Sequence, residues 1–284
     1  MQLATPLKKS ATIKATPQVD HAAWGLRATA LTYLSIMILL PLYVVFTSGL
    51  REGIEFFWNA VTQAQAIFAL KLTLTTAAIM TLINMLMGTL TAYVIVRYRF
   101  WGKVILDAMI DLPFAIPTLV TGLMLVLLYG PQTTLGAFFK DTWDIRIIFS
   151  PIGIVLALLF LGFPFVTRSV QPIFEQMDVH QPEASYTLGA SSWYTFRRVI
   201  FPYIRPAMLT GGLLGFARAL GEFGAIVLVA GNIPLKTQTA AVYIYGQVEG
   251  GNLPAASAVS VILVSISLLV TLLVEWLQRR NSHA

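Results

Sequence analysis

Charged residues are scarce in this sequence. Asp, Glu, Lys and Arg make up 11% of its 284 residues, whereas 57% of the residues are hydrophobic. Soluble domains carry about 25% charged residues, so a soluble globular domain is excluded. The composition predicts a protein that lies in a lipid bilayer.

Cysteine is absent, and only three histidines occur. A disulfide framework and a thiolate metal site are therefore excluded, and three scattered histidines do not form a cluster of metal ligands. The formal net charge of +6 arises from short basic segments between apolar runs rather than from a basic domain. We expect neither a metal site nor a nucleic-acid partner.

Three further signals are missing. Residues 1–23 contain no apolar run of signal-peptide length, and we interpret them as a cytoplasmic N-terminal tail. No internal repeat is visible, so nothing supports an inverted-repeat secondary transporter. No GxxxxGK[ST] phosphate loop occurs anywhere in the chain.

Uncharged runs long enough to cross a membrane occur six times. About 20 apolar residues at 1.5 Å per residue cross a hydrocarbon core of roughly 30 Å. The pattern predicts an all-α membrane protein with six transmembrane helices in a single transmembrane domain over residues 24–280, followed by a short C-terminal tail, 281–284. The expected spans are 28–46, 72–96, about 111–130, 147–167, 207–230 and about 255–274.

The distribution of basic residues indicates which ends of the spans face the cytoplasm. With both termini inside, thirteen of the nineteen Lys and Arg residues lie in cytoplasmic segments and five lie in outer segments. Positive charge favours the cytoplasmic side of a membrane. Both termini and the segment between spans four and five are therefore predicted to be cytoplasmic.

The third span contains Pro113 and Pro117, four residues apart. Each proline removes a backbone donor and bends a helix. In lipid such a break persists where neighbouring helices or a watery cavity satisfy the freed carbonyl groups. One interpretation is a transport pathway lined by Thr118, Thr121 and Gly122, with the two prolines as hinges. The other is a bent helix packed among its neighbours.

The fifth span contains two ionised residues, Arg218 and Glu222, four positions apart. An ionised side chain deep in a span costs about 2.5–3.5 kcal/mol on insertion scales, so the presence of these two residues in a span requires an explanation. Either they form an ion pair that lowers this cost and stiffens the helix, or Arg218 faces the route of an anion and Glu222 holds it in place. Gly221 and Gly224 are hinge candidates because glycine permits bending and close helix packing.

The longest polar segment of the chain is 182–206. Pro182 suits the first turn of a helix, and Gly189 can adopt the left-handed conformation that ends one. Ser191 or Ser192 can cap a second helix, which we expect Pro202 to end. The segment is therefore predicted to form two short helices joined by a bend. It either lies on the lipid surface or fits into a groove of another protein.

This segment resembles the EAA loop of the membrane subunits of ATP-binding-cassette importers. That motif reads E-A-A, three residues, G, nine residues and I-x-L-P. Glu183, Ala184, Gly189 and Pro202 stand at matching positions with the same spacing. The departures from the motif are Ser185, Val199 and Phe201.

The resemblance implies a cytoplasmic coupling helix, within a loop over about 178–205, between spans four and five of the importer permease fold. In that family the helix docks into a cleft of a separate ATPase subunit, present in two copies, which binds ATP and magnesium. We therefore expect no cofactor in this chain and no enzymatic activity of its own. The residues expected to contact the ATPase are Glu183, Ala184, Ser185, Leu188, Gly189 and Ala190.

Four segments narrow the resemblance to the sulfate or thiosulfate permeases of these importers, in the bacterial inner membrane. Molybdate permeases are similar through the coupling loop and the RALGEFGA segment, so a molybdate or tungstate permease is the alternative. An anion carrier driven by an ion gradient is the second alternative. The four segments are DLPFAIPTLVTGLMLV from Asp111, TLGASSWYTFRRVIFP from Thr187, FARALGEFGA from Phe216 and AGNIPLKTQTA from Ala230.

The resemblance also implies a second, homologous membrane subunit, which we expect to be a different chain rather than a second copy, and a periplasmic sulfate-binding protein. The polar loop 232–251, with Lys236, either contacts that binding protein or is solvated. Elsewhere, Lys103 with Asp107 and Glu275 with Arg279 are predicted to form ion pairs at helix ends.

Overall fold

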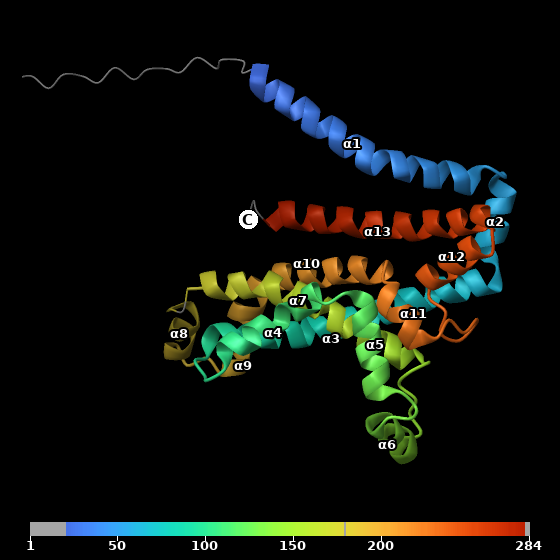
Figure 1. Ribbon diagram of the computed structural model, residues 1–284. Coiled ribbons are helices and arrows are strands. Elements are labelled where there is room, and N and C mark those ends of the chain that lie inside the picture. The colour runs from blue at the N-terminus through green and yellow to red at the C-terminus, as the bar shows by residue number, and fades with distance from the viewer. Residues whose placement is uncertain (1–20, 179, 282–284) are drawn as a thin grey trace, which may run out of the picture. The chain divides into compact units, whose positions relative to one another are not determined.

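The computed structural model describes residues 21–178 and 180–281, and every regular element in these ranges is helical (Figure 1). The predicted all-α fold is confirmed. The predicted N-terminal tail lies outside the described residues except for 21–23, and the C-terminal tail except for Asn281. The helices are α1 (His21–Leu50), α2 (Ile54–Thr62), α3 (Ala64–Arg97), α4 (Lys103–Ala115), α5 (Thr118–Tyr129), α6 (Thr134–Trp143), α7 (Pro151–Gln176), α8 (His180–Thr187), α9 (Ser192–Thr195), the π-helical turn η1 (Phe196–Ile200), α10 (Phe201–Leu220), α11 (Gly224–Ala230), α12 (Ala240–Glu249) and α13 (Leu253–Asn281).

The chain divides into two units, residues 1–44 and 45–284. In the first unit, α1 carries no charge beyond Arg27, and its side chains from Trp24 to Pro41 are exposed. Residues 24–50 are long and apolar enough to cross a membrane. The first unit therefore presents an apolar helix suited to contact with lipid or with another membrane helix.

Five helices of the described chain are long and apolar enough to span a membrane, and the bent pair α4–α5 makes a sixth. This number agrees with the six predicted spans. In chain order, the six are α1, α3, α4–α5, α7, α9–α10 and α13.

Helix α7 packs against both α3 and α10 in the second unit. Glycines allow the close approach, since a Cβ added at Gly88 of α3 would lie 3.0 Å from Val166, and one at Gly211 of α10 would lie 2.8 Å from the carbonyl oxygen of Phe165. Small residues serve this purpose in membrane helices because packing drives their association when lipid is as apolar as the side chains. These contacts fix α7 relative to both neighbours.

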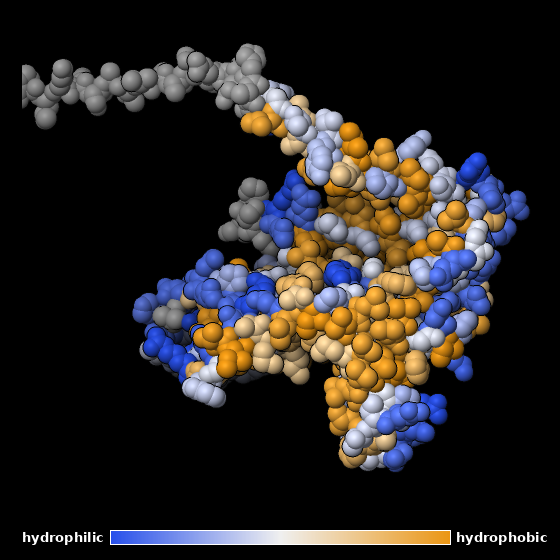
Figure 2. Space-filling view, in the orientation of Figure 1, coloured by the Kyte–Doolittle hydropathy of each residue, from blue (hydrophilic) through white to orange (hydrophobic). Residues whose placement is uncertain are grey.

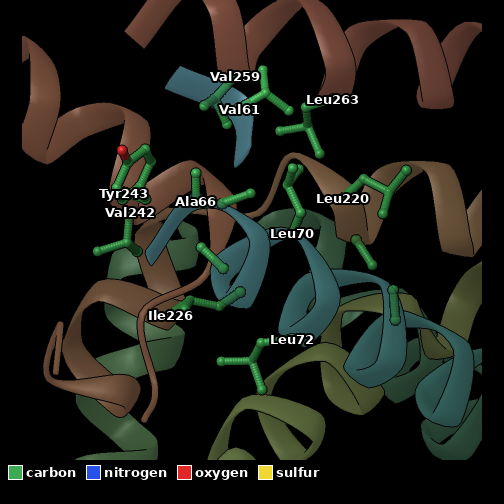
Figure 3. Close-up of a cluster of buried hydrophobic side chains, with 14 of the residues drawn as sticks. Val61, Ala66, Leu70, Leu72, Leu220, Ile226, Val242, Tyr243, Val259 and Leu263 are labelled. Atoms are coloured by element: carbon green, nitrogen blue, oxygen red, sulfur yellow. The ribbon is translucent and has the colours of Figure 1, made fainter. Parts of the chain in front are cut away.

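The largest buried cluster contains residues of α2, α3, α7, α10, α11, α12 and α13 (Figure 3). Leu70 and Leu72 contribute to it from the first turns of α3, together with Leu220 and Tyr243 from the C-terminal half of the chain. The last residue of α3, Arg97, instead lines a hollow beside α8. The main core and α8 therefore lie at opposite ends of α3.

The third span is broken between α4 and α5, which meet at an angle of 111°. Ile116 precedes Pro117 and has an extended backbone, with ψ of 127°, because the proline ring disfavours the helical conformation before it. Pro113 lies inside α4 and leaves that helix continuous. The predicted break is thus located at residues 116–117.

The second predicted short helix does not end at Pro202. Residues 192–220 form one continuous helical segment, in which α9 leads through η1 into α10. The Phe201 N–H bonds to the carbonyl of Phe196, one residue further back than in an α-helix. This wider turn accommodates the proline, which has no N–H and whose ring crowds the preceding turn of a regular helix.

The fifth span ends earlier than predicted. Helix α10 ends at Leu220, and α11 begins at Gly224 after a break of three residues. The predicted run 207–230 is therefore two helices. The break contains Gly221, whose conformational freedom disfavours a helix interior, and Glu222, whose carboxylate accepts the Ala225 N–H in the first turn of α11.

Candidate functional site

Helix α8 lies at one end of the α3, α7 and α10 helices of the second unit (Figure 1). It is closed by two backbone bonds, from Gly189 N–H to the Tyr186 carbonyl at 2.9 Å and from Ala190 N–H to the Ser185 carbonyl at 3.1 Å. This pair defines a Schellman C-cap, which needs a left-handed residue. Gly189 supplies it with φ of 83°. The predicted bend at Gly189 is therefore present, and Ser191 caps the next helix through its hydroxyl group.

The outer surface of this end is exposed and partly apolar. Leu188 is 88% exposed and Trp193 is 68% exposed, and no atom lies within 4 Å of a Cβ built at Gly189. Within α8 itself, residues 180–187 form no apolar stripe. A helix that lies on a lipid surface needs such a stripe, so the exposed end fits a protein partner better than the bilayer surface.

The inner surface of α8 contacts the chain sparsely. The hydroxyl groups of Ser185 and Thr195 are 2.9 Å apart and hydrogen-bonded. Beside them, a hollow of about 200 Å³ lies between Tyr186 of α8 and Tyr93 and Arg97 of α3. Of the predicted docking residues, Ser185 and Ala190 are half-buried, and the exposed ones are Glu183, Ala184, Leu188 and Gly189.

The breaks in the third and fifth spans lie next to each other. A Cβ added at Gly224, at the start of α11, would collide with the hydroxyl oxygen of Thr118, at the start of α5. One turn on, a Cβ at Gly122 would lie 2.7 Å from the carbonyl oxygen of Ala225. Thr121 is buried there, and its hydroxyl oxygen has no hydrogen-bond partner. The structure thus brings together residues that the sequence analysis placed in two separate spans.

Glu222 lies buried at this junction, with 2% of its side chain exposed. One carboxylate oxygen accepts the backbone N–H of Ala225 at 3.1 Å, and the other accepts Nη1 of Arg218 at 2.8 Å. The carboxylate therefore holds the first turn of α11 and the last turn of α10 at once. The side chain of Arg218 is 44% exposed, so the ion pair does not bury the whole side chain.

A second ion-pair cluster, which the sequence pattern did not predict, joins α7 to α4. Arg168 of α7 binds Asp107 at 2.6 Å and Asp111 at 2.6 Å, both on α4. The prediction that Asp107 pairs with Lys103 is therefore wrong, because the carboxylate faces α7. Two carboxylates four residues apart within an apolar helix were the available signal, since they require a cation from a neighbouring helix. The predicted pair of Glu275 and Arg279 is confirmed, at 2.5 Å.

A hollow of about 870 Å³ lies between α3, α7 and the bent pair α4–α5. Met87, Met124, Leu128 and Phe160 are among its mainly apolar lining residues, and Asn84 adds a polar group. Exposed apolar side chains also cover α5 (Figure 2). A doubly charged anion would lose its hydration in such surroundings without compensation, so this hollow is not an anion site.

The predicted loop 232–251 is partly folded into the core. Its second half forms α12, where the Ala240 N–H donates to the Thr73 hydroxyl of α3 at 2.8 Å. Tyr243 is buried, and burial raises the pKa of its phenol. Lys236, in the first half, is exposed. Residues 232–236 are exposed, as both interpretations of the loop require, whereas the prediction of a loop is wrong for α12.

Comparison with known proteins identifies the family of this arrangement. The family described as "Binding-protein-dependent transport system inner membrane component" matches residues 84–283. The chain belongs to this family. The description of the family as an inner membrane component agrees with the candidate membrane-spanning helices described above.

Several relatives within this family carry a more specific name. The chain is 41% identical over 259 residues to the probable sulfate transport system permease protein cysT of Chlorokybus atmophyticus. The aligned region covers 91% of this chain and 90% of the relative. The chain is 37% identical over 252 residues to the sulfate transport system permease protein CysT of Escherichia coli, covering 89% and 91%. The predicted resemblance to sulfate permeases of importers is confirmed.

A solved structure of another transporter has the same fold. A chain in the crystal structure of a bacterial alginate ABC transporter, in complex with an alginate pentasaccharide-bound periplasmic protein, superposes with a TM-score of 0.75. The two chains are 18% identical, with 92% of this chain and 95% of the other covered. The ABC permease fold predicted from the sequence is thereby confirmed.

Proposed function

We propose that this chain is the membrane-spanning permease subunit of an ATP-driven importer that moves sulfate or thiosulfate from a periplasmic binding protein into the cytoplasm. The observation that carries the proposal is the similarity, along about nine-tenths of the chain, to proteins named sulfate permeases. Membership in a family of binding-protein-dependent transporters argues against a carrier driven by an ion gradient.

The alternative cargo is molybdate or tungstate, and complementation distinguishes the two. The chain would be expressed in a strain that lacks its own sulfate permease and in one that lacks its molybdate permease, each supplied with the matching ATPase and binding protein. We expect restored growth on sulfate and none on molybdate. Rescue of the molybdate strain alone would overturn the proposed cargo.

Coupling to the ATPase would occur at α8. Its exposed end, with Leu188 and the φ of 83° at Gly189, supports docking into a cleft of another protein. ATP and magnesium would be bound by two copies of that partner, and this chain would hold no cofactor. Closure of the ATPases on ATP would displace α8 and, through the continuous helix that follows it, the spans.

Substrate passage would occur near the two helix breaks. Arg218 is an accessible cation within a span and would lower the barrier for a dianion, while the Glu222 contact at 2.8 Å keeps it in position. Thr118, Thr121 and Gly122 remain the proposed lining, with Pro113, Pro117, Gly221 and Gly224 as proposed hinges. Tight packing of α5 on α11 would then have to loosen when the pathway opens.

The remaining partners follow from the type of importer. A second, homologous permease subunit would complete the membrane part, and the binding protein would approach the side opposite α8, where Lys236 is exposed. Both termini and α8 would be cytoplasmic, in agreement with the distribution of basic residues.

A further inference from the structure

Arg168 uses all five N–H donors of its guanidinium group. Nε and Nη2 donate to the two carboxylate oxygens of Asp111, at 2.8 and 2.6 Å. Nη1 donates to the Asp107 carboxylate at 2.6 Å and to the Gln171 side chain at 2.6 Å, and Nη2 also donates to the Asp107 backbone carbonyl at 2.8 Å. A bidentate fork of this kind fixes direction as well as distance, which a single ammonium cannot do.

The cluster joins two different spans. The ion pairs Arg218–Glu222 and Arg279–Glu275 each join residues four positions apart in the sequence. The Arg168 pairs instead connect α7 to α4, which are about 60 positions apart in the sequence. They therefore constrain how one span moves relative to another.

Helix α4 depends on α7 for its position. Its outer side chains are exposed, with Val104 at 82% and Ile105 at 61%. Its main helix contact in the described chain is with α7, through the Arg168 cluster and a ring contact between Phe114 and Phe165 at 5.3 Å. Removing the Arg168 contacts would leave α4 held chiefly by that ring pair and its immediate surroundings.

The Arg168 cluster connects α7, which is followed by the proposed docking helix α8, with the broken span α4–α5. Helix α8 contacts α9 and η1, which continue into α10, and α10 packs against α7, so a displacement of α8 would reach α7 through these helices. On the other side of the link, α4 leads across Ile116 and Pro117 into α5, which packs on α11 beside Glu222.

We propose that Arg168 is a positioning residue for transport, which makes the α4 half of the broken span follow α7 when the ATPase displaces α8. The inference rests on the proposed function, because it assumes that an ATPase docks at α8. Without Arg168, α7 would move and α4 would lag, so ATP would be hydrolysed without movement of the pathway helices.

The test measures sulfate transported per ATP hydrolysed by the complete complex, reconstituted in vesicles with its ATPase and binding protein. The variants are Arg168→Gln, Arg168→Lys, Asp111→Asn and the double variant Arg168→Gln/Asp111→Asn. Arg279→Gln is the matched control, since it removes a guanidinium from an ion pair within one helix.

We expect Arg168→Gln to hydrolyse ATP within about twofold of the wild-type rate and to lose at least about tenfold in sulfate per ATP. Arg168→Lys should lose less, because an ammonium reaches one carboxylate but cannot fork. The double variant should be no worse than Arg168→Gln, since residues acting through one contact are not additive. The control should keep the wild-type ratio.

An unchanged ratio in Arg168→Gln would overturn the inference. If that variant does not reach the membrane, Arg168→Lys and Asp111→Asn decide by the same ratio, a fall supporting the inference and a wild-type value overturning it. Failure of the wild-type complex to transport sulfate would instead overturn the proposed function, so the two failures are distinguishable.

Discussion

At the scale of single residues, the contact between Glu222 and Arg218 fits both a structural role and a role in transport. The carboxylate is buried and supports the start of α11, which is a structural role, while the Arg218 side chain is 44% exposed. Removing one partner of a fully buried pair costs about 3–5 kcal/mol, and the cost is smaller here because the Arg218 side chain is partly exposed. Loss of transport in a single Arg218 variant could therefore result from lost structure or from a lost role in transport.

A charge-balanced double variant separates the two roles of Arg218. Arg218→Gln is expected to lose transport, and Arg218→Lys to retain most of it because the positive charge remains. Arg218→Gln/Glu222→Gln restores neutrality and keeps an oxygen acceptor for Ala225, so it should reach the membrane at the wild-type level. We expect it to remain inactive in sulfate uptake. Uptake near the wild-type rate in the double variant would limit Arg218 to a structural role.

At the element scale, α8 depends on a single backbone conformation. The Schellman cap requires the φ of 83° at Gly189, and no neighbouring atom obstructs a side chain there. The left-handed conformation costs other residues about 1–2 kcal/mol. The cost of a substitution at Gly189 therefore falls on the shape of α8 rather than on its packing within this chain.

Gly189→Ala is expected to reduce transport by up to about tenfold, because a cost of about 1.4 kcal/mol lowers the equilibrium constant for forming the native cap by that factor. A bulky Gly189→Val should abolish transport and uncouple ATP hydrolysis while the protein stays in the membrane. Gly246→Ala is the control, since a Cβ there also meets no atom but the backbone φ is not positive. Equal sulfate uptake in Gly189→Ala, Gly189→Val and the wild type would contradict the role of the cap.

The sequence predicted elements best where a local rule decided them. Gly189 and Ser191 act within one turn, so helix ends near them could be read from residue type. The outcome at Pro202 could not, because a π-helical turn absorbs the proline and the choice depends on packing along α10. The partner of Asp107 was missed for the same reason, since Arg168 is distant in sequence and no local pattern specifies it.

At the scale of the whole molecule, the number of spans followed from composition, because the bilayer sets a minimum length for an uncharged helix. The contact between the two helix breaks could not be predicted from composition, because it depends on Thr118 and Gly224, which lie in separate spans, coming together in the fold. The candidate site was thus predictable as a set of residues, and its geometry required the fold.

If closure of the ATPase drives sulfate transport through α8, then α8 must lie on the cytoplasmic side of the membrane. Because the natural chain has no cysteine, a single introduced cysteine gives a clean signal. Leu188 is 88% exposed at the α8 end, and Lys236 is exposed near the opposite end of α3. Neither side chain makes a contact on which the fold depends, so both positions accept substitution.

The most direct test is labelling of Leu188→Cys with a membrane-impermeant maleimide, compared with Lys236→Cys. In intact cells we expect Lys236→Cys to react and Leu188→Cys not to react. In inside-out vesicles stripped of the ATPase, Leu188→Cys should react, and adding back the ATPase should protect it. Labelling of Leu188→Cys from outside intact cells would contradict the cytoplasmic position of α8. Full labelling in the presence of bound ATPase would contradict docking of the ATPase at α8.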